Sequence, residues 1–524
     1  MTTQKRSIFT GMSQEESQKE ISALEIEIKV LKQESEYKDF VIAKLQKMLF
    51  GSSSERFSPE QLPNQMSLFN EQAGQVAKTE SAAEKEEITY QRTKQQKTKK
   101  IGGRIPLPKD LPRIEIVLEP KEDTTGMVKL RDQITEILDI KPPVFQVIRI
   151  VRPIYVNPKA KSEQVDQPIV IADLPSRPID KGIPSARLLA YLLVSKFVDH
   201  LPYYRQVNMF KRVGVILKAK TINGWVAKVC VLLKPLYEAF CKHHFAQPYL
   251  QGDETTLKVL KVKKNGKTGK AHTGYYWVYY DPVANQVVFI FDPGRGRKYP
   301  VQHLQHFSGK LQTDGLGVYT EFDKLDTITL YACMAHIRRK FVDALKNDEQ
   351  RASKVLTWIQ QLYEIEEVAR KEKYTPTQRL EVRQQKAAPI MAKMKTYLDE
   401  QYDSKQVLPK SAIGIAIGYA LGQWKKMERY LNNGMVEIDN NLVENAIRPV
   451  AIGRKNYLFA GSEQGAKWGA MIYTFLASAA RQEHNPLEYL SDVLRRLPET
   501  KTSQLHELFP ANWSPRPPSK LDLI

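Results

Sequence analysis

Residues 438–462 read IDNNLVENAIRPVAIGRKNYLFAGS, and this stretch does most to decide the fold. The polar run from Asp439 to Asn441 is favourable for a helix N-cap, so a helix is predicted to begin there. Glu444 would then lie about one turn inside the helix, and Glu437 would stay in the preceding loop. Pro449 is predicted to end or kink this helix, because the residue before a proline is biased away from helical angles.

Cations follow Glu444 at short intervals. Arg448 comes four residues later and shares a helical face with it, and Arg454 and Lys455 follow. A carboxylate and a cation on one face can bind a metal ion and the neighbouring phosphate of a nucleic acid together. A second basic run, Arg338-Arg339-Lys340, stands upstream, and all these cations are candidate contacts to DNA phosphates.

Two more acidic residues stand in strand-like surroundings. Asp253 lies in QGDETT, inside a predicted strand, and Asp314 ends the short strand of LQTDG. A charged side chain in a buried strand is costly unless it is paired or bound to a metal. Two Mg²⁺ ions held by carboxylates can activate a nucleophile and stabilise the leaving oxygen of a phosphoryl displacement. Each acid alone is weak support, because most acidic side chains lie on surfaces or cap helices.

The segments around these acids form a mixed α/β pattern. Three successive antiparallel strands are predicted, and two further strands follow, with helical segments between them: 249–262, 274–281, 286–292, 311–314 and 327–332. Residues 346–430 are predicted to be helical. We assign 246–345 and 431–480 to a catalytic core, 346–430 to an insertion, and 481–524 to a C-terminal tail domain.

The N-terminal half divides into four parts. Residues 1–50 include a heptad pattern that predicts either a short, imperfect coiled coil or a helix packed on its own protein, with a and d positions Ile21, Leu24, Ile28, Leu31, Ile42, Leu45 and Leu49. Residues 51–100 are expected to be a flexible basic linker. Residues 101–175 are typical of a small β-rich module, with strand-like pieces at 145–151 and 169–171.

Residues 176–245 are predicted to form a helical DNA-binding domain. Two candidate helices, Tyr203–Arg212 and Thr221–Leu233, are joined by Val213-Gly214-Val215. This arrangement is either a helix-turn-helix with its second helix in the major groove or a plain helical hairpin. Its cations are candidate phosphate partners: Arg205, Lys211, Arg212, Lys218 and Lys220.

Composition narrows the class of partner. The chain has 524 residues, 42% of them hydrophobic, and a net charge of +20, which favours a polyanion such as nucleic acid. Three cysteines exclude a disulfide framework. The N-terminus lacks a signal-peptide pattern, and the longest apolar run is too short to span a bilayer. We therefore expect a cytoplasmic, nucleoid-associated protein that works without a membrane.

Several stretches together resemble the DDE transposases of bacterial insertion sequences, above all the TnpC-type large transposase of the insertion sequence 66 family. They run in order along almost the whole chain: MLFGSSSERF (48–57), HLPYYRQ (200–206), DETTLKVL (253–260), LQTDG (311–315), ACMAHIRRKF (332–341), the 438–462 stretch and NPLEYLSDVLRRLP (485–498). The resemblance implies metal-dependent cleavage of DNA strands and transfer of the freed 3′-OH to target DNA.

The same resemblance implies an RNase H-like catalytic fold in which Asp253, Asp314 and Glu444 hold two Mg²⁺ or Mn²⁺ ions. The spacings are 61 residues (314 − 253) and 130 residues (444 − 314), and the second requires an inserted domain. The implied partners are the DNA ends of the element, target DNA, further copies of the chain in a homo-oligomer, and small companion proteins encoded by the same element.

One departure from the family concerns zinc. Its members usually carry a cysteine-based zinc module before the helix-turn-helix, but residues 120–175 here contain no cysteine, so no zinc is expected. Cys241-Lys242-His243-His244 lacks the ligand spacing of a closed site. His336 either contacts DNA, positions a metal-bound water or makes a structural hydrogen bond. Two other functions stay open, an RNase H-like nuclease or resolvase and a domesticated DNA-binding protein without catalysis.

Overall fold

The structure is a computed structural model that describes residues 107, 109, 111–120, 122–141, 144–156, 169–260, 271–404 and 406–516. The predicted coiled coil and basic linker therefore lie outside the described residues. Among the residues described, none of the helices combines the length and apolar character needed to cross a membrane. The description below concerns the compact unit that begins at residue 102.

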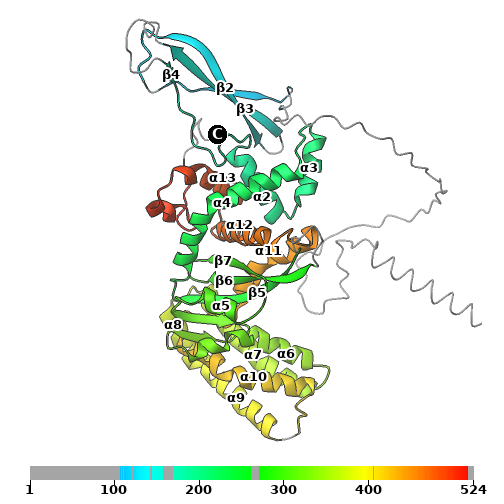
Figure 1. Cartoon of the computed structure of the whole chain (residues 1–524). Coiled ribbons are helices and arrows are strands. Elements are labelled where there is room, and N and C mark those ends of the chain that lie inside the picture. Colours follow the sequence, from blue (N-terminus) through cyan, green and yellow to red (C-terminus); the bar gives the residue numbers. More distant parts are fainter. Residues whose placement is uncertain are drawn as a thin grey trace, which may run out of the picture. The chain divides into compact units, whose positions relative to one another are not determined.

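A five-stranded mixed sheet includes Asp253, and Asp314 directly follows one of its strands; three of the strands, β5, β6 and β7, are labelled in Figure 1. Its strands run in the order β7-β6-β5-β8-β9. The first three along the chain pair antiparallel, whereas β8 and β9 join β5 in parallel. The strands lie where the sequence predicted them: β5 (Tyr249–Val259), β6 (His272–Asp281), β7 (Gln286–Asp292), β8 (Gly309–Thr313) and β9 (Ile328–Tyr331).

Both faces of this sheet are covered because alternate residues of its strands are apolar on each side. Tyr276, Val278 and Phe289 belong to a large core that α11 (Asn441–Tyr457) and α12 (Glu463–Arg481) help to form. Trp277 and Tyr279 point into a smaller core on the other face. The short segments on that second side are α5 (Lys298–His303) and η3 (Gly317–Lys324).

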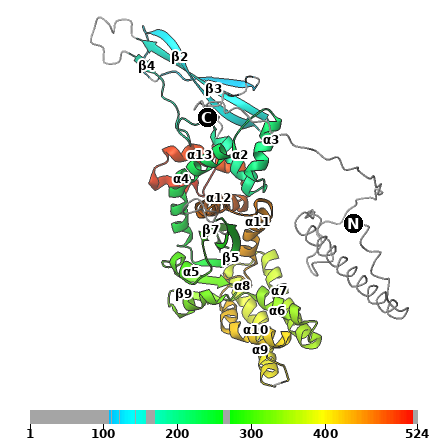
Figure 2. The same ribbon diagram turned by 45° about the vertical axis from the view of Figure 1, so that its right-hand side comes forward.

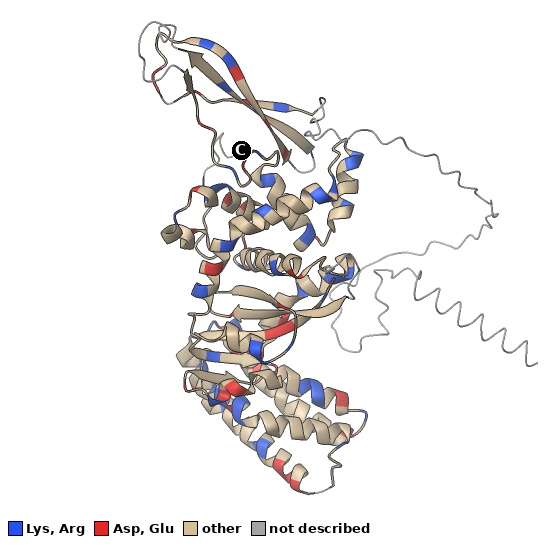
Figure 3. Cartoon of the chain, viewed as in Figure 1, with Lys and Arg blue, Asp and Glu red and all other residues tan. Residues whose placement is uncertain are grey.

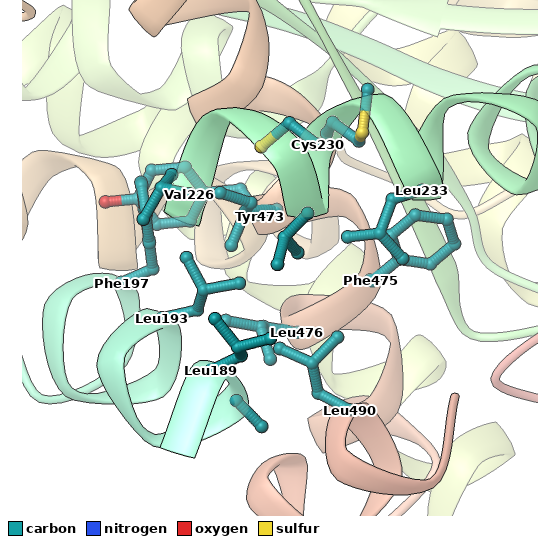
Figure 4. Packing of buried hydrophobic residues seen from close by; sticks show 14 of the residues in the cluster. Leu189, Leu193, Phe197, Val226, Cys230, Leu233, Tyr473, Phe475, Leu476 and Leu490 are labelled. Atoms are coloured by element: carbon teal, nitrogen blue, oxygen red, sulfur yellow. The ribbon is translucent and has the colours of Figure 1, made fainter. Parts of the chain in front are cut away.

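The large core extends into helices from both ends of the described chain (Figure 4). Leu189, Val226 and Leu490 meet there from three different helices, next to Tyr473 and Phe475 of α12. The helices are α2 (Ala186–Phe197), α3 (Tyr203–Arg212), α4 (Ala219–His244) and α13 (Pro486–Arg496), followed by η6 (Leu497–Glu499) and η7 (Thr502–Leu508). The predicted helices at 203–212 and 221–233 are confirmed, and α4 extends further than predicted.

A second sheet precedes these helices. It contains β1 (Arg113–Val117), β2 (Val128–Lys141), β3 (Val144–Val156) and β4 (Ile169–Ile171), and the predicted strand-like pieces lie in β3 and β4. Leu138 joins this sheet to the segment before α2, because its amide donates to the carbonyl of Ile183. The chain is thus a mixed α/β protein.

A set of helices is inserted between β9 and α11 (Figure 2). These helices enclose a second core that includes Phe341, Ile359 and Met394, and Tyr249 of β5 and Tyr331 of β9 also belong to it. They are α6 (Met334–Ala344), α7 (Glu349–Lys371), α8 (Pro376–Val382), the π-helical turn η4 (Arg383–Ala387), α9 (Ala388–Asp403), α10 (Ala412–Glu428) and η5 (Arg429–Asn432). The helical character predicted for residues 346–430 is confirmed.

Candidate active site

Strand register brings Asp253 and Asp314 side by side. The parallel pairing of β5 with β8 runs to Gly252 opposite Thr313, and the two aspartates are the next residue of each strand's chain. Each carboxylate is held by a backbone amide, from Glu254 at 2.7 Å for Asp253 and from Leu316 at 2.9 Å for Asp314. Two acids separated by 61 residues (314 − 253) are therefore brought together where the pairing of β5 with β8 ends.

A tight turn fixes the backbone after Asp314. Gly315 has a φ of +86°, a conformation that strains any residue with a side chain. A Cβ at this position would also lie 2.9 Å from the hydroxyl oxygen of Tyr419. That hydroxyl donates a 2.7 Å hydrogen bond to the carbonyl oxygen of Asp314. The Asp-Gly pair of LQTDG thus has a geometric reason, and α10 of the insertion helps to position Asp314.

Glu444 comes from the first turn of α11, as predicted. Its carboxylate lies 3.8 Å from Nε2 of His336 and 3.8 Å from a guanidinium nitrogen of Arg339, both on α6. Asp439 helps to begin the helix by accepting the amide of Asn441 at 3.1 Å. The side chain of Asn440 is buried and makes no hydrogen bond at either polar atom.

Pro449 does not end the helix, since α11 continues through it to Tyr457; the predicted alternative of a kink stays a prediction. A proline removes one backbone donor, whose acceptor here would be the carbonyl four residues earlier, at Asn445. Asn445 is exposed, so water can satisfy that carbonyl. Apolar packing of Val443, Ala446 and Val450 holds the rest of the helix on the core.

Neighbouring carboxylates affect the pKa of Asp253. Burial is the main cause that raises the pKa of Asp253 well above its usual range. The neighbouring carboxylates of Glu254, Asp314 and Glu444 raise it further. His336 is half-buried, which lowers its pKa, while Asp314 and Glu444 oppose that shift. The site therefore concentrates negative charge that a cation would relieve.

An unforeseen polar network anchors α11 to the sheet. Gln251 is fully buried; its side chain donates to the carbonyl of Asp439 at 2.9 Å and accepts from the amide of Val443 at 3.2 Å. Gln312, also fully buried, accepts from Gln251 at 3.0 Å and donates to the carbonyl of Glu437 at 2.8 Å. The strands that carry the aspartates thereby also fix the start of the Glu444 helix.

Two acids near the site are neutralised by arginines that the sequence did not point to. Glu254, the neighbour of Asp253, accepts a 2.7 Å hydrogen bond from Arg295. Glu437 accepts two hydrogen bonds from Arg379, at 2.6 and 2.7 Å. Neither arginine lies in a motif, so only the folded arrangement distinguishes these paired acids from Asp253, Asp314 and Glu444.

The predicted phosphate contacts occupy different places (Figure 3). Arg454 is engaged within the protein, donating to Thr255 Oγ1 at 2.8 Å and to the carbonyl of Thr256 at 2.7 Å. This contact ties the end of α11 to β5. The others are exposed, on α6 near Glu444, on α11 and at the start of α4: Arg338, Arg339, Lys340, Arg448, Lys455, Lys218 and Lys220.

The donor set suits a hard divalent cation, because carboxylate oxygens are the ligands Mg²⁺ prefers. The observation that supports this fit is that Asp253, at the end of the β5–β8 pairing, is partly buried beside the carboxylates of Asp314 and Glu444, which raise its pKa. In the part of the chain that the structure describes, no three acidic, imidazole or thiol groups are already close enough to form a metal cage. The carboxylates would therefore have to converge around an ion.

Comparison with known proteins gives consistent matches. A family model described as "Transposase IS66 family" matches residues 181–468, and one described as "Transposase C of IS166 homeodomain" matches residues 40–116. Two uncharacterized proteins of Sinorhizobium fredii are similar over most of their length. The protein y4qI is 35% identical over 425 residues, covering 77% of this chain and 76% of its own. The protein y4jD is 32% identical over 427 residues, covering 78% and 81%.

Proposed function

The chain belongs to the IS66 family of transposases, and from that premise we propose that it is a DDE-type transposase with an RNase H-like catalytic core. It would cut DNA at the ends of its insertion sequence and join the freed 3′-OH to target DNA. The observation that carries this proposal is the adjacency of Asp253 and Asp314 on β5 and β8, with Glu444 facing them from α11.

The three carboxylates would hold two Mg²⁺ or Mn²⁺ ions, which when bound supply a Lewis acid and an activated nucleophile for in-line displacement at phosphorus. The protein's own residues orient the three carboxylates. Gln251 and Gln312 fix the approach of α11, and Tyr419 fixes the turn at Asp314. Arg338, Arg339 and Arg448 would receive the DNA backbone beside the acids.

The proposal also includes the assembly of the protein with DNA and its other partners. The heptad segment in residues 1–50 would contribute to a homo-oligomer that pairs two element ends. Residues 51–100 would add sequence-independent phosphate contacts. Target DNA and small companion proteins of the same element would complete the complex, and no zinc is assigned to the sheet of β1–β4.

The decisive experiment incubates the protein with labelled element ends, a target plasmid and Mg²⁺ or Mn²⁺. Joined products would support a transposase. Cut ends without joining would favour the alternative of an RNase H-like nuclease or resolvase. Binding without cutting, with an Asp253→Asn variant behaving like the wild type, would favour a DNA-binding protein that has lost catalysis.

DNA binding is predicted to weaken steeply with salt, because each neutralised phosphate releases counterions. Lys218 and Lys220 are exposed at the start of α4. Changing both to Ala should reduce the slope of log affinity against log salt by about 2, at roughly 0.9 per phosphate contact. Fluorescence anisotropy titrations at several salt concentrations measure this slope. Lys393 and Lys410 of the insertion, changed to Ala, are the control pair and should leave it unchanged.

Gln251→Leu is predicted to lower the rate of strand cleavage by roughly 10²-fold, since small displacements of catalytic groups cost that much. The substitution removes the donor to the buried carbonyl of Asp439 and one of the two acceptors of the Val443 amide, which keeps its 3.1 Å hydrogen bond to the carbonyl of Asn440. Single-turnover cleavage and DNA affinity should be measured together, and affinity should stay nearly constant.

A matched control separates positioning by Gln251 from a general loss of stability. Gln146 is a buried glutamine of the other sheet that donates to Asp139 at 2.5 Å. Gln146→Leu should lower the melting temperature without a comparable loss of cleavage rate. Equal loss of cleavage in the two variants at a temperature where both are folded would contradict a positioning role for Gln251.

A further inference from the structure

A cavity of about 300 Å³ lies next to the catalytic strand. It is bounded by α2 and α3, the start of α4, the far end of β5 and the connection between α11 and α12. Aromatic rings supply much of its wall, from Phe197, Tyr203, Tyr276, Tyr457, Phe459 and Trp468. Its volume lies at the lower end of the range for sites that hold small organic molecules.

The cation in this cavity has no acidic partner. Nζ of Lys196 lies 4.2 Å from the ring centroid of Tyr203 and 5.7 Å from that of Tyr457. No carboxylate among the described residues forms an ion pair with Lys196, and burial lowers its pKa to about 8. The hydroxyl of Tyr203 is buried and makes no hydrogen bond. The ammonium of Lys196 and the hydroxyl of Tyr203 are therefore buried polar groups in a largely aromatic site. Burying them without hydrogen-bond partners costs free energy, and a ligand that accepts their hydrogen bonds would offset that cost.

Two consecutive apolar side chains are exposed in the segment that follows Tyr457 of the cavity wall. Leu458 has a φ of +62°, a strained conformation for leucine, and is 62% exposed. Phe459, which lines the cavity, is 45% exposed. The strain persists because Ala460 is tied to β5 on both sides, through the carbonyl of Lys258 and the amide of Leu260. The protein thus holds two apolar side chains at the surface directly after the helix that carries Glu444.

The cavity lies within reach of DNA bound at the catalytic acids. Leu257, in its wall, is four residues after Asp253 on β5, so about 13 Å separates them at the usual rise of a strand. Both residues lie on the same face, because strand side chains alternate. Arg454 ties the α11 side of the wall to the strand at Thr255. The wall of the cavity therefore lies about 13 Å along β5 from the first candidate metal ligand, a distance of a few nucleotides.

We propose that this cavity receives a single nucleobase swung out of the duplex beside the cleavage site. The inference rests on the proposed function. Planar bases stack on aromatic rings, and their edges accept hydrogen bonds from ammonium, hydroxyl and amide groups, here Lys196, Tyr203 and the exposed Asn223. Apolar side chains such as Leu458 and Phe459 wedge between base steps in proteins that distort DNA.

A phosphate fits the cavity less well than a base. Most of the wall is apolar or aromatic, and Lys196 is the only cation among the lining residues. The N-terminus of α12 borders the cavity, but Glu463 places a carboxylate in its first turn. That negative charge opposes an anion at this end of the helix.

The test uses the full-length protein with the Asp253→Asn substitution, which stops the reaction before cleavage. Anisotropy measures its affinity for end duplexes that are matched, mismatched or abasic at each of three pairs flanking the cut. One mismatch should tighten binding about tenfold, because a mispaired base is easier to extrude. An abasic nucleotide at the same place should lose the gain, because nothing is left to stack.

Two cavity variants make the result specific. Gly461→Trp fills the cavity from its wall, where a Cβ meets no atom within 4 Å. Lys196→Met removes the charge while keeping the length of the side chain. Both should abolish the preference for the mismatch, while Gly422→Trp, at an exposed helical glycine that is equally open, should retain it. Melting temperatures establish that each variant is folded.

The outcomes distinguish failure of this inference from failure of the proposed transposase function. Loss of the mismatch preference in both cavity variants would support the extruded base. A preference that survives in both, or is missing in the Asp253→Asn protein itself, would overturn the inference and leave the transposase proposal standing. Failure of the protein to bind end duplexes more tightly than unrelated DNA would overturn both.

Discussion

Glu444→Gln should lower the rate of strand cleavage by roughly 10³-fold or more while leaving folding and end binding nearly intact. Metal stabilisation of a phosphoryl transition state is worth several kcal/mol, and each tenfold in rate corresponds to about 1.4 kcal/mol. The substitution removes one negative charge but keeps the shape of the side chain. Because Glu444 is half-exposed and only 3.8 Å contacts join it to His336 and Arg339, little folding energy depends on it.

Glu437→Gln is the matched control, since it makes the same change at the nearest other glutamate in the sequence. Glu437 lies outside α11 and its carboxylate is turned to Arg379. Most cleavage activity should remain in this variant. Single-turnover cleavage of a labelled element end, with anisotropy for affinity and circular dichroism for folding, measures both variants. An inactive Glu437→Gln beside an active Glu444→Gln would show that the third ligand has been misassigned.

Local sequence signals were enough to place the acids on their elements. Polar residues at 439–441 indicated the start of the Glu444 helix, and the five strands lie where the sequence predicted them. The helix did not end at Pro449, because packing of the helix outweighed a local preference. Local signals are reliable where a turn or a cap determines the conformation, and they fail where tertiary contacts oppose them.

The polar contacts that hold the site together could not be predicted in the same way. Gln251 and Gln312 look like ordinary strand residues, and their partners at 437–443 are more than a hundred residues away. Such pairs depend on strand register and on how a helix docks, which no local pattern specifies. Arg295 beside Glu254 is a further case, since it comes from the loop after β7.

A buried ion pair in the insertion is another contact that local sequence patterns do not predict. Arg383 is fully buried and donates to the two carboxylate oxygens of Glu366 at 2.7 and 2.9 Å. It also donates to the carbonyls of Tyr430 and Asn433. Arg379 adds two further hydrogen bonds to Glu366 and connects it to Glu437. The π-helical turn η4 begins at Arg383, so an irregular backbone presents this side chain to the core.

This network links the insertion to the catalytic helix. Burial alone would raise the pKa of Glu366, but the paired arginines outweigh it and the net pKa is lowered from 4.5. A carboxylate whose folded pKa is lowered stabilises the fold above its unfolded pKa and ceases to do so as the pH falls through the folded value. The insertion should therefore lose stability below about pH 4.5.

Glu366→Gln is predicted to destabilise the insertion by about 3–5 kcal/mol, because it leaves two arginines without their buried carboxylate. Thermal unfolding and amide hydrogen exchange of α7–α10 measure this loss. Glu367→Gln is the matched control on the same helix, since Glu367 is exposed and pairs only with Lys371, and it should leave the melting temperature unchanged.

A second variant shows whether the loss comes from the unpaired charge rather than from the lost contact. Glu366→Met combined with Arg383→Met replaces the pair by apolar side chains of similar size, and should recover much of the stability that Glu366→Gln loses. The loop from Tyr430 to Glu437 leads into α11, so cleavage should fall in Glu366→Gln and recover with stability in the double variant. Equal melting temperatures for Glu366→Gln and Glu367→Gln would mean that this ion pair does not hold the insertion together.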